Sequence, residues 1–192
     1  ILLFFLFICV KSYADNNADS VDLVTIGSSD AKVKIKIFSS LTCPHCANFH
    51  IKVIPKIKKE YVDSGKVQLI FIDFPLDLAS LNASKLLHCL DKKKQIIFLD
   101  TVYEKQNEWT VGSNIEEINN NLKKIVKDLG IKSSYFNKCL NNQIITDKIL
   151  NGRIEGNKDY SINSTPTIVI NEKKFKGETN FKNIKKRIEK LI

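Results

Sequence analysis

The sequence has few residues that could hold a metal ion, with five cysteines and three histidines among 192 residues. Two of the cysteines, Cys43 and Cys46, lie close together, and His50 follows them. A structural zinc site needs four ligands, usually supplied as two such pairs. Because no second pair lies nearby in the sequence, we predict neither a metal nor another cofactor.

The first part of the chain lacks an apolar run long enough to cross a bilayer. Ile1–Val10 is almost wholly apolar but is only ten residues long, whereas a spanning helix needs about 20. Ser12-Tyr13-Ala14 is an acceptable cleavage site for a secretory signal, although the usual basic start is missing. We therefore expect residues 1–14 to be a signal peptide with a truncated start, and the alternative is an uncleaved membrane anchor.

Acidic residues are in the minority, 21 against 30 basic ones, which gives a net charge of +9. Removing the signal takes away Lys11 alone and leaves +8. The densest basic stretch, residues 182–190, interleaves with Phe181, Ile184 and Ile188 at helical spacing, so its lysines are the solvent face of a helix. No nucleic-acid-binding motif accompanies the charge, and we predict no nucleic acid partner.

The motif Cys43-Pro44-His45-Cys46 follows directly after the apolar run of residues 35–41. Proline suits the first position of a helix, because its missing N–H would be unpaired there and its fixed φ is already helical. We therefore expect Cys43 to be the N-cap. The free N–H groups of the first turn and the helix dipole would favour its thiolate, and His45 would add to that stabilisation.

Cys46 lies one turn further along, in line with Phe49, Val53 and Ile57, which is the spacing of a buried helix face. We expect the sulfur of Cys43 to be exposed and that of Cys46 to be sheltered. Dithiol exchange needs this asymmetry, because a partner thiolate attacks one accessible sulfur and the second cysteine resolves the mixed disulfide. The alternatives are a structural disulfide or half a zinc site.

Two strands flank the predicted helix. Lys32–Phe38 alternates lysine with apolar residues, and Val67–Phe74 is an apolar run rich in β-branched and aromatic residues. With the helix between them they form a βαβ unit with parallel strands, so that Cys43 lies at the carboxyl edge of the sheet. Pro55 should kink the helix without ending it. Val21–Ile26 predicts a short strand ahead of this unit.

Residues 76–160 contain no strand-like run. Breaks at glycines and at an Asn-Asn pair separate five predicted helices: Leu78–Leu90, Lys94–Gln106, Ile115–Leu129, Ser134–Leu140 and Gln143–Gly152. We expect Trp109 to be a packing anchor of this insertion, and we interpret His88, next to Cys89, as a bystander rather than a ligand.

Removing residues 1–14 leaves four cysteines, and an even count in an exported protein favours pairing. If Cys43 and Cys46 form the exchanging pair, Cys89 and Cys139 are left for each other. Two buried free thiols are the alternative, which a reducing cytosol would favour. The signal segment makes the disulfide our prediction.

The β pattern returns late in the chain. Residues 168–170 and 174–176 predict two short strands ahead of a terminal helix, and Thr165-Pro166 precedes the first of them. A proline that opens a strand can have a cis peptide bond. From the sequence alone, the commoner trans form is favoured.

These pieces, in this order, resemble the DsbA-like thiol:disulfide oxidoreductases of bacterial cell envelopes. The resemblance rests on residues 38–50, 65–77 and 165–167, and it covers the chain from about Gly27 to the end. It implies an α/β protein with a thioredoxin fold, a central mixed sheet with flanking helices, interrupted by an all-helical insertion. The implied divisions are 15–26 for a leader and short first strand, 27–75 with 161–192 for the thioredoxin-like domain, and 76–160 for the insertion.

The resemblance also implies roles for the motif. Cys43 attacks or is attacked, Cys46 resolves, and the Pro44-His45 dipeptide is similar to that of strong oxidants, whose reduced form is stabilised.

It further implies that Pro166 is cis and faces the pair, and that the backbone of Thr165 pairs with an extended substrate peptide. A bond between Cys89 and Cys139 would resemble the subset of the family with an extra disulfide in the helical domain.

We therefore predict a protein disulfide oxidoreductase, a dithiol oxidase of the periplasm. It would pass its disulfide to unfolded, cysteine-containing exported proteins and be reoxidised by a membrane partner of the DsbB type. We expect a monomer, with a trimerising or membrane-anchored form as the alternative. No added dimerisation domain is visible, which makes an isomerase less favoured. The rival functions are a reductase or isomerase using the same pair, and a thiol-based metal-binding protein.

One feature departs from the resemblance. Many thioredoxin-fold oxidoreductases carry a carboxylate in the central strand beneath the active pair, but residues 32–42 contain none and Ile37 stands about where it is expected. Proton handling at Cys46 would then depend on water or on a distant group.

Overall fold

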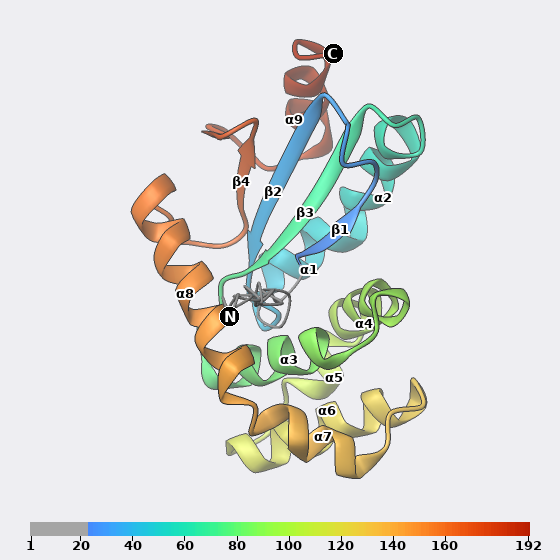
Figure 1. The fold of residues 1–192 in the computed structure, drawn as a ribbon, viewed down its shortest axis with the longest axis vertical. Coiled ribbons are helices and arrows are strands. Elements are labelled where there is room, and N and C mark those ends of the chain that lie inside the picture. The colour runs from blue at the N-terminus through green and yellow to red at the C-terminus, as the bar shows by residue number, and fades with distance from the viewer. Residues whose placement is uncertain (1–22) are drawn as a thin grey trace, which may run out of the picture.

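A computed structural model describes residues 23–192, so the expected signal peptide of residues 1–14 lies outside the described part of the chain. The centre of the fold is a five-stranded sheet in the order β1-β3-β2-β4-β5 (Figure 1). Its strands are β1 Val24–Ile26, β2 Val33–Ser39, β3 Val67–Asp73, β4 Thr167–Ile170 and β5 Lys173–Lys174. Parallel β2 and β3 form the middle, and the other pairings are antiparallel. The predicted α/β class with a mixed central sheet is confirmed.

The connection from β2 to β3 is helical. It consists of α1 Pro44–Lys52, α2 Ile54–Ile57 and the π-helical segment η1 Lys58–Val62. The interruption falls at Val53, two residues before Pro55, yet Val53 keeps helical dihedrals and its N–H donates to the carbonyl of Phe49 at 2.9 Å. The helical path is therefore interrupted next to Pro55 and then continues through α2 and η1, because proline removes one donor without forbidding the helical backbone.

The two faces of the sheet are covered differently. The larger core lies under α1, α2 and the C-terminal helix α9 Phe181–Glu189, and it includes the fully buried Ile35, Leu69 and Ile184. The other face holds a smaller cluster around Phe38 and its neighbours, completed by the end of α8. Each fully buried aliphatic side chain contributes about 1.5–3 kcal/mol, so the larger core is the main source of stability.

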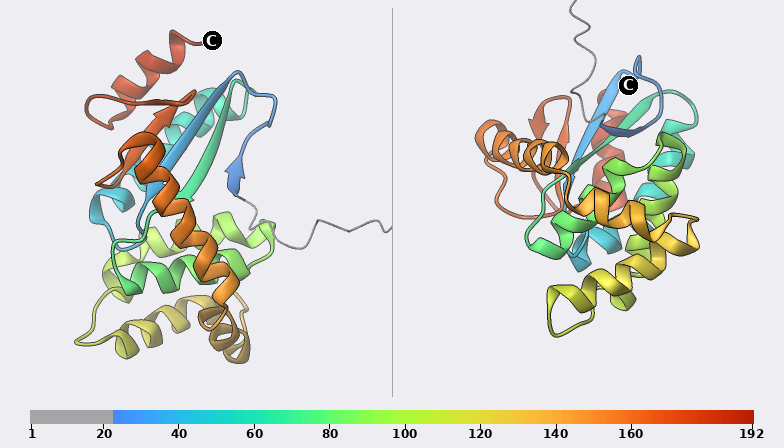
Figure 2. Two further views of the ribbon diagram at one scale, coloured as in Figure 1. Left: turned by 60° about the vertical axis from the view of Figure 1, so that its left-hand side comes forward. Right: turned by 60° about the horizontal axis from the view of Figure 1, so that its bottom comes forward.

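Six helices separate β3 from β4. They are α3 Leu78–Cys89, α4 Lys92–Glu104, α5 Gln106–Trp109, α6 Ile115–Asp128, α7 Ser133–Leu140 and α8 Gln143–Tyr160. The helices α3 to α7 form a layer at the carboxyl edge of β2 and β3, and α8 runs back along the sheet (Figures 1 and 2). The indole of Trp109 is fully buried and donates to the carbonyl of Val102 at 2.8 Å, as expected of a packing anchor.

Helix α8 is longer than predicted, because it passes Gly152 and ends only at Tyr160. Glycine favours the end of a helix, but here tertiary packing keeps the chain helical beyond Gly152. Gly156 is buried, and a Cβ at this position would lie 2.7 Å from Cε1 of Phe38. Further along, the ring of Tyr160 contacts Phe38 with centroids 5.8 Å apart. The last turns of α8 therefore belong to the sheet core, and the division of the chain at residues 76 and 160 stays a prediction.

Within residues 23–192, no helix combines the length and the hydropathy that a membrane crossing requires.

Candidate functional site

The cysteine pair lies where β2 gives way to α1. Cys43 is the N-cap, with an extended backbone of φ −79° and ψ 118°, and Pro44 occupies the first turn. Pro44 and His45 are exposed, whereas Cys43 is only 9% exposed and Cys46 2%. Cys43 is thus less exposed than expected, with the Thr165 carbonyl 3.5 Å from its sulfur, but it remains the more exposed of the two cysteines.

The two thiols, which are not joined in this structure, differ sharply in acidity. Burial alone would raise the pKa of Cys43, but contacts with Thr165, with Cys46 and with the backbone N–H of His45 outweigh it, so the pKa lies below its usual value. Burial raises the pKa of Cys46 to about 12. A thiolate at Cys43 is therefore favoured over one at Cys46, which is the polarity that an attacking and a resolving cysteine need.

Thr165 approaches the pair from the opposite end of the chain. The peptide bond between Thr165 and Pro166 is cis, and β4 pairs with β2 so that Thr167 lies opposite Phe38. This register brings the carbonyl oxygen of Thr165 to 3.5 Å from Sγ of Cys43. The resemblance thus anticipated the cis form, which the sequence alone did not favour.

The turn before Cys43 is tied to the first turn of α3. The fully buried hydroxyls of Ser40 and Ser80 are 2.8 Å apart, and Ser80 also accepts the N–H of Leu41 at 2.9 Å. Thr42 donates to the carboxylate of Asp77 at 2.7 Å, while Asp77 caps α3. The backbone that carries Cys43 is therefore held by the helical insertion as well as by the sheet.

The same turn is also held by a side chain of α5. Nε2 of Gln106 donates to the carbonyl oxygens of Leu41 at 2.8 Å and of Cys43 at 3.1 Å. The side chain of Gln106 is buried between α5 and the turn, and the residue is 5% exposed. From the sequence, Gln106 was predicted only to be the last residue of a helix. It lies 63 residues from Cys43, and no local pattern signals such a contact.

Aromatic and ionisable groups lie deeper along the buried side of α1. His50, one turn after Cys46, stacks on Tyr103 with centroids 4.7 Å apart and bonds Asp100 at 2.7 Å. Burial, followed by the charge of Cys46, raises the pKa of Tyr103 well above its usual value. Tyr103 is therefore a neutral hydroxyl close enough to Cys46 to respond to its charge.

A buried carboxylate exists, but on the strand beside the expected one. Asp73 ends β3 opposite Ser39, bonds Nε2 of His88 at 2.6 Å, and accepts the hydroxyl of Ser84. Burial alone would raise the pKa of Asp73, but His88 and Ser84 outweigh it and the pKa lies below its usual value. His88, interpreted from the sequence as a bystander rather than a ligand, has its side chain buried against this carboxylate and holds it in place.

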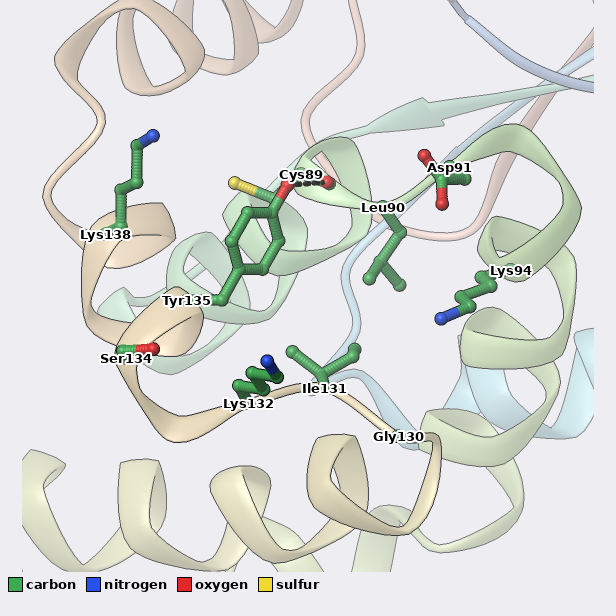
Figure 3. A pocket seen from close by; sticks show the side chains of 10 residues that line it. All are labelled: Cys89, Leu90, Asp91, Lys94, Gly130, Ile131, Lys132, Ser134, Tyr135 and Lys138. Carbon is green, nitrogen blue, oxygen red and sulfur yellow. Dashed lines mark hydrogen bonds between the residues drawn. The ribbon is translucent and has the colours of Figure 1, made fainter.

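Cys89 and Cys139 are joined by a disulfide that links α3 to α7, with a Cα–Cα distance of 5.9 Å. Beside it lies a pocket of about 410 Å³ (Figure 3). The hydroxyl of Tyr135 crosses this pocket and donates to the carbonyl of Cys89 at 2.6 Å. The disulfide thus fastens two helices of the insertion and is separate from Cys43 and Cys46.

Among the described residues 23–192, no group of three or more histidine, cysteine, aspartate or glutamate side chains could hold a metal ion.

The fold and the cysteine pair define a thioredoxin-like protein with a dithiol at the start of its first long helix. A family model described as thioredoxin matches residues 19–190. The crystal structure of alpha-DsbA1 from Wolbachia pipientis matches with a TM-score of 0.81 and 31% identity, covering 88% of this chain and 90% of that one.

Curated relatives agree with this match. A probable disulfide bond formation protein D of Bacillus anthracis is 31% identical over 175 residues, which are 88% of this chain and 77% of the relative. A putative protein-disulfide oxidoreductase of Rickettsia bellii is 29% identical over 80% of this chain, which spans only 58% of that relative's length. The chain belongs to the thioredoxin family and, within it, to the DsbA-like protein-disulfide oxidoreductases.

Proposed function

We propose that the protein is a dithiol oxidase that introduces disulfide bonds into exported proteins through Cys43 and Cys46. The observation that carries the proposal is the difference between the two thiols, since the pKa of Cys43 is lowered whereas burial raises that of Cys46 to about 12. A stabilised Cys43 thiolate favours the reduced form of the protein, so its disulfide is readily given away.

In the proposed reaction, a substrate thiolate attacks Sγ of Cys43 in the oxidised pair. The bond between Cys43 and Cys46 breaks, and the sulfur of Cys46 leaves with the electron pair and takes up a proton. A second substrate thiolate then attacks the substrate sulfur of the mixed disulfide and releases the Cys43 thiolate. The substrate loses two electrons and gains a disulfide, while the enzyme ends as the dithiol.

Four further roles complete the proposal. Pro44 and His45 belong to the catalytic motif, with Pro44 starting the helix and the backbone N–H of His45 contacting the Cys43 sulfur. Thr165 and Pro166 form the substrate-binding edge. The Thr165 carbonyl lies 3.5 Å from Sγ of Cys43, so a peptide pairing with this segment would bring its own cysteine to the sulfur that it attacks.

The partners and the location follow from the direction of exchange. The substrates are unfolded, cysteine-containing exported proteins, and a membrane reoxidase of the DsbB type returns the pair to the disulfide. The protein acts in the periplasm, as a monomer. A disulfide donor is useful only where such bonds persist, outside the reducing cytosol.

The test is oxidation of a reduced two-cysteine model peptide by the purified disulfide form, followed by mass spectrometry. We expect one peptide disulfide to form for each protein disulfide that is lost, and no reaction by the Cys43→Ser variant. Absence of peptide oxidation by the wild-type protein would sink the proposal.

A reductase or isomerase would use the same residues in the other direction. Equilibration with glutathione buffers separates these possibilities. A potential well above the value of about −270 mV for thioredoxin supports a disulfide donor, and a value near it supports a reductant.

A further inference from the structure

Besides the contacts from α3, a side chain of α5 holds the backbone next to the cysteine pair. Gln106 lies at the start of α5, and its Nε2 reaches the carbonyl oxygens of Leu41 and Cys43 at 2.8 and 3.1 Å. A carboxamide nitrogen has two N–H groups, so each carbonyl can receive one of them. These two carbonyls lie on either side of the turn that presents the Cys43 sulfur.

Both hydrogen bonds are buried, which increases the free energy that would be lost without them. Gln106 is 5% exposed and Leu41 is 2% exposed, and a buried carbonyl without a partner costs more free energy than one that water can reach. The carbonyl of Cys43 also accepts the first helical bond, from the N–H of Ala47 at 3.1 Å. Gln106 therefore fixes the backbone that determines where the first turn of α1 points its N–H groups.

The charge on the Cys43 sulfur differs between the two redox forms. In the reduced pair the lowered pKa of Cys43 favours its thiolate, whereas the disulfide is neutral. A group that makes the surroundings less negative therefore favours the reduced form. The carbonyl oxygen of Cys43 carries partial negative charge in the same residue as this sulfur, and the N–H groups that Gln106 donates to it and to the Leu41 carbonyl offset this charge. Removing these donors should therefore favour the disulfide.

We propose that Gln106 is a positioning residue of the exchange reaction, through which the helical insertion sets the redox equilibrium of Cys43 and Cys46. This inference deepens the proposed function and rests on it for its biological meaning. The equilibrium itself is a property of the pair, whichever way exchange runs. The insertion is then part of the redox centre as well as a cover over it.

The chain offers a matched control in Gln95. This glutamine is also buried, at 6% exposure, and also lies in the insertion, but it donates to the carbonyl of Leu87 at 3.4 Å. We compare Gln106→Leu and Gln106→Met with Gln95→Leu in the full chain. Methionine has about the length of glutamine and removes the donors without adding a charge, so it decides the question should the leucine variant not fold.

Three quantities are measured for each variant. The fraction of oxidised Cys43–Cys46 in glutathione buffers gives the equilibrium constant, the ultraviolet absorbance of the thiolate gives the pKa of Cys43, and the fluorescence of the single Trp109 in urea gives stability. We expect both Gln106 variants to shift the equilibrium constant about five- to tenfold toward the disulfide, with a higher Cys43 pKa. A tenfold shift corresponds to about 30 mV.

Gln95→Leu should lose stability while its equilibrium constant stays within about twofold of the wild type. The inference is wrong if the Gln106 variants shift the equilibrium no more than Gln95→Leu does. A different result would overturn the proposed function alone: wild-type protein that does not oxidise the model peptide, although the Gln106 variants still shift the glutathione equilibrium.

Discussion

Nε2 of His88 lies 2.6 Å from Oδ2 of Asp73, and the two side chains are only 5% and 11% exposed. The pair joins the end of β3 to the last turn of α3, so it fastens the insertion to the sheet. It also places a buried carboxylate on β3, next to the central strand β2, which has none. Because Asp73 contributes to the raised pKa of Tyr103, as Cys46 does, the carboxylate and the sheltered thiol share one electrostatic environment.

Asp73→Asn should strongly reduce stability at neutral pH. Removing one partner of a buried hydrogen bond to a charged group typically costs about 1–3 kcal/mol or more, because the other partner stays buried and unsatisfied. Urea unfolding, followed by the fluorescence of Trp109, measures this loss. Asp63→Asn is the control, because it removes an ion pair with Lys58 in which both side chains are about half exposed, and such surface pairs contribute about 0–1 kcal/mol.

The free energy of unfolding should also depend on pH through the protonation of Asp73. Its pKa in the folded protein is lowered, so the unfolded chain binds the proton more readily. The stabilisation is fully present above the ordinary aspartate pKa of about 3.9 and is lost as the pH falls through the lower folded value. Unfolding free energies between about pH 6 and pH 3 should therefore fall more steeply for the wild type than for Asp73→Asn. Equal slopes would contradict this assignment.

The two cysteines should react with iodoacetamide in different pH ranges. In Cys46→Ser the remaining Cys43 thiol should be alkylated rapidly below the usual cysteine pKa of about 8.5, because its thiolate is stabilised. In Cys43→Ser the remaining Cys46 thiol should react very slowly at pH 7, since burial is the main reason that its pKa is raised to about 12. Rates from pH 4 to pH 9, read by mass spectrometry, test both expectations. Similar profiles for the two variants would contradict the proposed division of roles.

Much of the fold could be predicted because its signals are local. The alternation in residues 32–38, the apolar run from Val67 and the proline after Cys43 each specify an element through neighbouring residues. The strands β2 and β3 accordingly lie within one residue of their predicted bounds. The family resemblance added the cis bond at Pro166, which no local rule favoured.

The contacts that complete the site could not be predicted in this way. Gln106 and Ser80 act on a turn about 40 to 60 residues away, and only the packing of the insertion brings them there. The same holds for His88, whose partner Asp73 lies on another element, and for the low exposure of Cys43. Helix α8 was predicted too short, because tertiary packing at Gly156 overrides the helix-ending tendency of glycine.

Loss of the disulfide between Cys89 and Cys139 should weaken the fold without changing the active pair. The bond closes a loop with a sequence separation of 50 residues, and the chain-entropy model gives about 4 kcal/mol for such a loop. The double variant Cys89→Ala/Cys139→Ala should unfold at a lower urea concentration. Its glutathione equilibrium at Cys43 and Cys46 serves as the control and should stay close to that of the wild type, whereas a large shift would show that the disulfide acts on the active pair.

Two glycines of α8 should respond oppositely to the same substitution. In a helix interior, alanine is favoured over glycine by about 1 kcal/mol. At Gly152 no atom lies within 4 Å of an added Cβ, so Gly152→Ala should raise the unfolding free energy by up to about that amount. At Gly156 the Cβ would lie 2.7 Å from Cε1 and 3.1 Å from Cδ1 of the buried Phe38. Gly156→Ala should therefore be destabilising by about 1–3 kcal/mol, the usual cost of overpacking a core. Urea unfolding of both variants decides the matter, and equal stabilisation by the two would mean that α8 does not pack on the sheet at Phe38.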